Sequence, residues 1–124
     1  KVMIIGVGTD MDEIGRIEKA CEKPSFLTRV YTEEECRQAG GNCTRLAGSF
    51  AVKEAVAKVM GTGFRSFWPS EIQVLRDELG KPYVVLLGGA EKAAKERGIT
   101  RIHVSITNTA VYAMAFAVGE GEEL

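Results

Sequence analysis

Apolar residues recur every three or four positions over much of the first half of the chain, a spacing that is typical of helices. The opening segment differs: it is short, apolar and rich in β-branched residues, and it therefore predicts a strand. The strongest predicted helix covers residues 44–60, which include no proline, one glycine and many alanine and valine residues. The chain should begin with a strand at 2–7, which ends at Gly8-Thr9-Asp10, and continue with a helix from Ile14 to Cys21, which ends before Pro24. A short helix should then begin at the capping box formed by Thr32 and Glu35 and end at Gly40-Gly41. The long helix follows it.

Strand patterns dominate the second half of the chain. In chain order we expect a hairpin of strands at 71–76 and 83–87, a helix around residues 90–94 that stops at Gly98, strands at 102–106 and 111–118, and a mobile acidic tail from about residue 119. Helices and hairpins mixed in this way predict an α+β fold. At this length we expect a single small domain over residues 1–124, with the long helix packed on antiparallel strands.

Charge and cysteine content narrow the class of protein. Sixteen Lys and Arg residues against 17 Asp and Glu residues give a net charge of −1, which argues against a general nucleic-acid-binding or membrane-surface protein. No apolar run reaches the roughly 18 residues of a membrane-spanning helix. The three cysteines are an odd number at spacings unlike those of metal sites, and no secretory leader pattern is evident. We therefore expect a soluble cytoplasmic protein.

Two carboxylates, those of Asp10 and Glu54, are candidates for a metal site. On a helical wheel Glu54 falls among apolar residues of the long helix, which is apolar almost all round and is expected to be buried. A buried carboxylate needs a partner. One interpretation pairs Glu54 with Lys58 one turn later, on a solvated face. The other lets Glu54 share a hard cation with Asp10, whose simpler role would be to cap the following helix.

The residues around Glu54 also suit a phosphate ligand. Residues 42–68 contain four basic side chains (Arg45, Lys53, Lys58 and Arg65) and only one acidic side chain, so their local charge is +3. The turn Gly61-Thr62-Gly63 either ends the helix or offers backbone N–H groups to an anion. Mg²⁺ is usually held by one or two carboxylates plus substrate phosphates and water. The residues alone therefore predict a domain with a Mg²⁺ and phosphate site, which also suits a phosphohydrolase.

Four segments carry a more specific resemblance. They are Gly6-Val7-Gly8-Thr9-Asp10, the stretch LAGSFAVKEA from Leu46 to Ala55, Gly61-Thr62-Gly63, and Gly80-Lys81-Pro82. In this order and spacing they resemble the holo-acyl-carrier-protein synthases, a family of 4'-phosphopantetheinyl transferases, from about Met3 to Val118. The resemblance implies a Mg²⁺-dependent transfer of 4'-phosphopantetheine from coenzyme A to a serine of apo acyl carrier protein, with release of adenosine 3',5'-bisphosphate. The holo carrier protein that results would serve fatty-acid synthesis. It also implies a homotrimer with sites between neighbouring subunits.

The resemblance assigns roles to individual residues. It implies that Asp10 and Glu54 are metal ligands and, with Lys58 at the diphosphate, the catalytic residues. It places Gly61, Gly63, Gly80, Lys81, Pro82 and Thr109 at the nucleotide. It also implies that Arg16 and Arg29 meet the acidic carrier protein, although solvated surface charge is the alternative for both.

Two positions depart from the family pattern. The family usually has G-R-F where this chain has Gly48-Ser49-Phe50, and S-I-S-H where it has Ser105-Ile106-Thr107-Asn108. The missing arginine and histidine help to hold the nucleotide's phosphates. Arg45 lies one turn before Ser49 and could reach the same phosphate, and Asn108 keeps hydrogen-bonding capacity without charge. We expect weaker coenzyme A binding, and a non-catalytic paralogue that binds carrier protein or nucleotide remains an alternative to the transferase, beside the phosphohydrolase.

Overall fold

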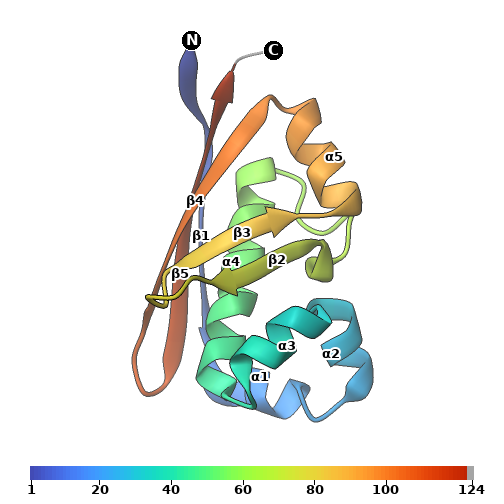
Figure 1. The fold of residues 1–124 in the computed structure, drawn as a ribbon, viewed down its shortest axis with the longest axis vertical. Helices are drawn as coiled ribbons and strands as arrows, with labels where there is room; N and C mark the ends of the chain where they lie inside the picture. Colours follow the sequence, from blue (N-terminus) through green and yellow to red (C-terminus); the bar gives the residue numbers. More distant parts are fainter. Residues whose placement is uncertain (123–124) are drawn as a thin grey trace.

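A long central helix organises the fold, with an antiparallel sheet on one side and a hairpin on the other (Figure 1). The structure, a computed structural model, describes residues 1–122. The elements are β1 (Val2–Glu13), α1 (Ile14–Ala20), α2 (Pro24–Val30), α3 (Glu33–Ala39), α4 (Cys43–Met60), the 3-10 turn η1 (Pro69–Glu71), β2 (Ile72–Arg76), β3 (Pro82–Leu86), α5 (Gly88–Glu96), β4 (Ile99–Asn108) and β5 (Tyr112–Glu122). The predicted α+β fold is confirmed, and so is the long helix packed on antiparallel strands.

The larger sheet has the antiparallel order β1-β5-β4, and its inner face lies against α4. Two glycines of β1 allow the helix to come close. A Cβ added at Gly8 would overlap the carbonyl oxygen of Ala55, and one at Gly6 would lie 2.6 Å from that of Val59. The backbones of β1 and α4 are therefore in direct contact, and this contact fixes how the residues after Gly8 face the helix.

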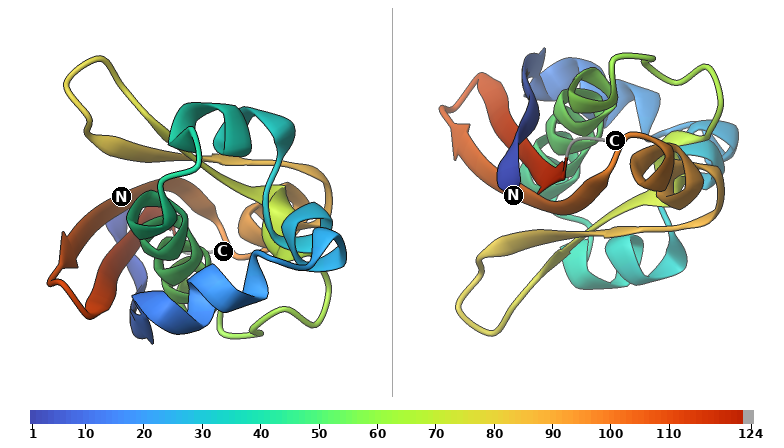
Figure 2. Two further views of the ribbon diagram at one scale, coloured as in Figure 1. Left: turned by 90° about the horizontal axis from the view of Figure 1, so that it is seen from below. Right: turned by 90° about the horizontal axis from the view of Figure 1, so that it is seen from above.

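Small side chains on β5 complete the contact with α4. Ala113, Ala115 and Ala117 point inward and are buried, whereas Tyr112 and Phe116 lie on the outer face and are exposed. This alternation is what a strand produces when only one of its faces meets the core. Viewed nearly along its axis, α4 is enclosed by the sheet, the β2-β3 hairpin and the short helices (Figure 2). The helix is buried almost all round, as predicted.

A buried ion pair joins α4 to α3 and β2. Lys53 is 0% exposed, and its Nζ lies 2.8 Å from a carboxylate oxygen of Glu35 and donates to the carbonyls of Pro69 and Ile72. Glu35 is also the second member of the capping box, in which it accepts from the backbone N–H of Thr32. The predicted capping box is therefore confirmed, and its carboxylate has a second role that local sequence does not reveal.

Three features of the fold depart most from the prediction. β1 does not end at Val7 but pairs with β5 as far as Glu13, opposite Tyr112, so Asp10 lies within a strand and does not cap α1. Pro24 occupies the first turn of α2, a helix the pattern did not predict, where its missing N–H costs nothing. The expectation of a mobile tail from about residue 119 is wrong for Gly119–Glu122, which belong to β5. Residues 123–124 lie outside the described residues.

Candidate functional site

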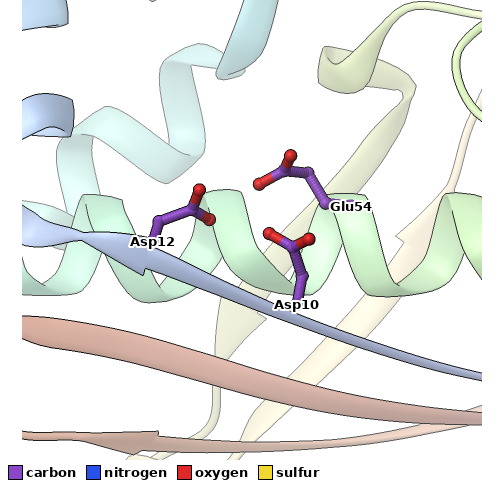
Figure 3. A group of neighbouring side chains, drawn as sticks. All are labelled: Asp10, Asp12 and Glu54. Carbon is purple, nitrogen blue, oxygen red and sulfur yellow. The ribbon is translucent and has the colours of Figure 1, made fainter.

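Three carboxylates converge where β1 passes α4. Asp10 and Asp12 are two residues apart on β1 and project from the same face, the one that Gly6 and Gly8 turn toward the helix. Glu54 projects from α4 to meet them, and Figure 3 shows the three side chains facing a common point. One oxygen from each residue lies within 4.8 Å of the others. The sequence-based prediction that Asp10 and Glu54 lie close together is confirmed.

The three acidic side chains of the cluster meet few hydrogen-bond donors. One oxygen of each carboxylate (Asp10 Oδ2, Asp12 Oδ2 and Glu54 Oε1) is buried and has no hydrogen-bond partner among the described residues. Burial, reinforced by the neighbouring carboxyl groups, raises the pKa of Glu54 to about 10. Burial also raises the pKa of Asp12, with a further contribution from Asp10. For Asp10 the effect of burial is outweighed by the neighbouring Glu54 and Asp12 carboxyl groups and by the Lys58 ammonium, which leave its pKa below the ordinary value. Like charges this close require either a shared proton or a cation.

Lys58 lies beside the cluster. Its Nζ donates to the backbone carbonyl of Thr9 at 2.7 Å and to Oδ1 of Asp10 at 3.1 Å. The interpretation in which Lys58 pairs with Glu54 one turn earlier on α4 is therefore wrong, because β1 supplies a closer carboxylate. The Lys58 side chain is 57% exposed, so its ammonium also faces solvent at the mouth of the cluster.

The other predicted site residues are distributed over several loops. Gly61 ends α4 in a left-handed conformation, with its N–H on the carbonyl of Lys58, so the helix-termination role of this turn is confirmed. Gly63 also has a positive φ. Gly80-Lys81 and Pro82 form the end of the β2-β3 turn, where the N–H of Lys81 donates to the Asp77 carboxylate.

One copy of the chain does not bring all these loops together. Val59, just before the Gly61 turn, packs at Gly119, whereas Asn108, next to Thr109, pairs with Ala113. Six strand residues separate Ala113 from Gly119, which corresponds to about 20 Å along the sheet. The Gly61-Gly63 turn and the Asn108-Thr109 turn therefore lie at different ends of α4.

The predicted basic residues lie at three separate places. Arg16, on α1, is exposed and lies close enough to Asp12 for its charge to offset part of the rise that burial causes in the pKa of that carboxyl. Arg29, on α2, lines a surface hollow with Arg65 and Trp68. Arg45 lies in the first turn of α4, where its carbonyl accepts a hydrogen bond from Arg76.

Sequence reasoning missed Asp12 as a member of the cluster. The signal was present in the spacing, because residues i and i+2 of a strand share a face and Asp10 was already a candidate. Asp12 was overlooked because the strand was expected to end at Val7. Beyond the end of a strand, the pattern does not predict on which face a side chain lies.

Comparison with known proteins shows the family. The family model of the 4'-phosphopantetheinyl transferase superfamily matches residues 6–117. A holo-[acyl-carrier-protein] synthase of Lachnoclostridium phytofermentans is 57% identical over 118 residues, which cover 95% of this chain and 97% of the relative. An acyl carrier protein synthase of Plasmodium yoelii with ADP bound superimposes with a TM-score of 0.88 at 32% identity, and 99% of each chain is covered. A holo-(acyl-carrier-protein) synthase of Bacillus anthracis in complex with coenzyme A (3',5'-ADP) gives a TM-score of 0.80 at 32% identity, over 97% of this chain and 99% of that one.

The chain therefore belongs to the 4'-phosphopantetheinyl transferase superfamily and is an enzyme of the transferase class. Within that class, the relatives that it matches over nearly their whole length are holo-acyl-carrier-protein synthases, so the resemblance stated from the sequence is confirmed. Among the described residues, no helix has the length and apolar character needed to span a membrane.

Proposed function

We propose that this enzyme transfers 4'-phosphopantetheine from coenzyme A to a serine of an apo acyl carrier protein, requires Mg²⁺ and releases adenosine 3',5'-bisphosphate. The observation that carries the proposal is the convergence of three carboxylates, with the Lys58 ammonium beside them, on a fold shared with holo-acyl-carrier-protein synthases. The Bacillus anthracis relative is in complex with coenzyme A, which supports coenzyme A as the donor here.

The donor set of the cluster fits Mg²⁺. Carboxylate oxygens are the ligands that this hard cation prefers, and three of them are buried here without a hydrogen-bond partner among the described residues. Asp10 and Glu54 would hold the ion, as the family resemblance implies, and Asp12 offers a third oxygen. When bound, Mg²⁺ neutralises the negative charge that builds up on the diphosphate as the P–O bond breaks.

Lys58 is suited to contact the diphosphate. An ammonium group has three hydrogens to donate, and two of them are directed to Thr9 and Asp10. The third is free to meet a phosphate oxygen at the exposed side of the cluster, where it would stabilise the charge of the leaving group. Lys58 would thus bind the same diphosphate as the metal and leave Oδ2 of Asp10 to the ion.

The nucleotide would bind along the loops that the resemblance indicates. Left-handed residues such as Gly61 and Gly63 turn successive backbone N–H groups toward one side, which suits a phosphate. The Gly80-Lys81-Pro82 turn adds a further cation. The turn of Asn108 and Thr109 is about 20 Å along the sheet from Gly61 in the same copy, so a ligand that meets both would lie between two copies.

The outer face of the sheet supports a homotrimer. On β1, Val7 and Met11 are 56% and 58% exposed, and on β5 the facing Met114 and Phe116 are 47% and 45% exposed. Apolar side chains gathered on one sheet face favour coverage by another protein surface. We propose that neighbouring copies cover this face and complete each other's sites. Phe116→Glu should convert the trimer to monomers in light scattering and abolish transfer, whereas a wild-type monomer at micromolar concentration would contradict the arrangement.

The carrier protein would dock on the basic residues near the site. Arg16 lies beside the carboxylate cluster, where an acidic partner could present its serine, and Arg29 and Arg65 share a hollow with Trp68. Charge complementarity of this kind mainly accelerates association and is weakened by salt.

We propose that the enzyme works in the cytoplasm and supplies holo carrier protein for fatty-acid synthesis. In the described part of the chain, all three cysteines are free thiols, which fits a reducing compartment.

The decisive experiment is the mass of an apo acyl carrier protein after incubation with the enzyme, coenzyme A and Mg²⁺. We expect a gain of one phosphopantetheine, no gain in EDTA, and no gain for a carrier protein whose acceptor serine is replaced by alanine. Release of adenosine bisphosphate without any carrier protein would instead indicate a phosphohydrolase. Binding of coenzyme A with no mass gain would indicate a non-catalytic paralogue.

A further inference from the structure

Two of the three cysteines lie where α1 packs against the start of α4. Cys21 is the C-cap of α1, and Cys43 is the first residue of α4. Between the two helices, Ile17 is buried against Ala47, and Cys21 packs against the same cluster. The two thiols therefore belong to one helix–helix contact, although about 22 residues of chain separate them.

The course of the chain brings both thiols to the same end of this contact. β1 runs antiparallel to α4, since its two glycines meet successively earlier turns of the helix. The contact of Ile17 with Ala47 continues this order, and α1 lies at the lower end of α4, where that helix begins (Figure 1). One further turn of each helix, four residues and about 6 Å, leads from Ile17 to Cys21 and from Ala47 to Cys43. Cys21 therefore faces Cys43.

The groups around each sulfur atom agree with this arrangement. Burial raises the pKa of the Cys43 thiol, and the carboxylate of Glu18, on α1, adds to the rise. Burial also raises the pKa of the Cys21 thiol, and Cys43 adds more to that rise than Cys36 does. Cys43 thus lies beside α1, and of the two other cysteines it acts more strongly on Cys21.

The two thiols have no metal to bind. All three cysteines are free, and the one group of three metal-ligating side chains among residues 1–122 is the carboxylate cluster. The sulfur of Cys43 has one long contact, 3.9 Å to the carbonyl oxygen of Gly41. A disulfide needs two Cα atoms within about 7 Å and side chains directed toward each other. Two thiols that face each other across a helix contact meet this need.

We propose that Cys21 and Cys43 form a redox modification site, in which a low-molecular-weight disulfide such as glutathione disulfide oxidises the two thiols to an intramolecular disulfide. The Cys43 thiolate attacks one sulfur atom of the oxidant and releases one thiol. The Cys21 thiolate then attacks the sulfur of Cys43 and releases the second thiol. The protein loses two hydrogen atoms, the new S–S bond joins α1 to α4, and the oxidant is reduced to two thiols. This inference does not rest on the proposed function.

The disulfide would stabilise the fold and leave the carboxylate cluster unchanged. It closes a loop of about 22 residues that contains α2 and α3, and such a closure restricts the unfolded chain. Glu54 lies eleven residues beyond Cys43 on α4, about 16 Å along the axis. Because the raised pKa values keep both thiols protonated near neutral pH, the dithiol form persists in a reducing compartment, and oxidation requires an excess of the oxidant.

Peptide mapping of the native protein after incubation with glutathione disulfide tests the proposal. We expect the intact mass to fall by two hydrogen atoms, a crosslinked peptide pair with Cys21 and Cys43, and one thiol, that of Cys36, open to alkylation after unfolding. The oxidised protein should melt roughly 10 °C above the reduced protein, and dithiothreitol should reverse the shift. Cys36→Ser is the matched control and should oxidise as the wild type does, whereas Cys21→Ser should gain one glutathione and show no such shift.

Three results would overturn the proposal. They are a crosslink that includes Cys36, a wild-type protein that keeps all three thiols or stops at the mixed disulfide, and a disulfide of Cys21 and Cys43 that forms only in urea. The last result would show that the folded protein holds the two sulfur atoms too far apart. The peptide map of the wild type is decisive even if a substituted variant melts below the assay temperature. No substrate enters the assay, so its result is independent of whether the enzyme modifies the carrier protein.

Discussion

The two sides of α4 carry opposite charges that the described residues do not neutralise. On the side facing β1, three carboxylates converge with a single ammonium at their edge. On the side facing β2, the guanidinium of Arg76 lies against Ser49 and the carbonyl of Arg45, and no ion pair among residues 1–122 includes it. Glu54, on the first side, and Ser49, on the second, are five positions apart on the helix. Each side therefore has charged groups without a full counter-charge among the described residues, and each would be stabilised by a ligand of opposite charge. Lys53 lies between them and differs from both, since its charge is fully paired within the chain.

Removing Glu54 should have the largest effect on activity. Glu54→Gln leaves the shape of the cluster but removes one of the two proposed metal ligands, so we expect the rate of phosphopantetheine transfer to fall at least about 1,000-fold. Because the substitution also removes a buried acid next to two others, the metal-free protein should melt at the same or a higher temperature. Glu96→Gln, at an exposed position of α5, is the control for both measurements. A loss of folding in Glu54→Gln would mean that the carboxylate serves the fold and not the ligand.

Breaking the paired charge should have the largest effect on stability. Lys53→Met leaves Glu35 buried without its cation, and we expect a loss of about 3–5 kcal/mol in the free energy of unfolding, measured with urea. Adding Glu35→Gln should recover part of this loss, because the unpaired charge is removed. Lys92→Met, at an exposed position of α5, should change stability by less than about 0.5 kcal/mol. Equal losses in the single and double variants would show that the hydrogen bonds, and not the charge, dominate.

The pH dependence of stability should distinguish the carboxylate side from the rest of the helix. Since burial and the neighbouring acids raise the pKa of Glu54 to about 10 from an ordinary value near 4.5, the folded state holds a proton that the unfolded state has released between these values. This contribution to stability is present in full below about pH 4.5 and is lost as the pH rises toward 10. In EDTA the melting temperature should therefore fall from pH 5 to pH 9 more in the wild type than in Glu54→Gln. Saturating Mg²⁺ should reduce the fall, because the ion binds the deprotonated form.

The smallest expected effect comes from the third carboxylate. Asp12→Asn keeps a neutral oxygen in the cluster, so we expect the dissociation constant for Mg²⁺ alone to rise by about tenfold while transfer at saturating Mg²⁺ stays within a few-fold of wild type. Glu13→Gln, at the next and exposed residue of β1, is the matched control for titration calorimetry. An unchanged Mg²⁺ affinity in Asp12→Asn would limit the metal ligands to Asp10 and Glu54.

Local sequence was sufficient where local interactions decide the structure. The helix α4 has the composition of a helix along its whole length, and the capping box of Thr32 and Glu35 depends on residues three apart, so both were predicted. The proximity of Asp10 and Glu54 followed from the expectation that a core strand and a core helix of a small domain pack together.

Local sequence failed where partners come from distant segments. The part of β1 after Gly8 lacks a strong apolar alternation and is held as a strand by pairing with β5, about 100 positions later. The pairing of Glu54 with Lys58 was expected from their spacing, yet Asp10, 48 residues away from Lys58, takes that contact. The contact of Arg76 with Ser49 depends on where β2 lies against the helix, and the sequence of α4 alone does not predict that position.

The glycine contact between β1 and α4 has a consequence for the choice of metal ion. Because a Cβ at Gly8 would overlap the carbonyl of Ala55, the two main chains that carry Asp10 and Glu54 are in contact, and their separation is fixed. A site of fixed span discriminates by ionic radius: Mg²⁺ needs oxygens at about 2.1 Å, whereas Ca²⁺ needs about 2.4 Å and tolerates irregular geometry. The close contact at Gly6 and Gly8 therefore limits how far the two carboxylates can move apart, and we expect the enzyme to bind Ca²⁺ more weakly than Mg²⁺.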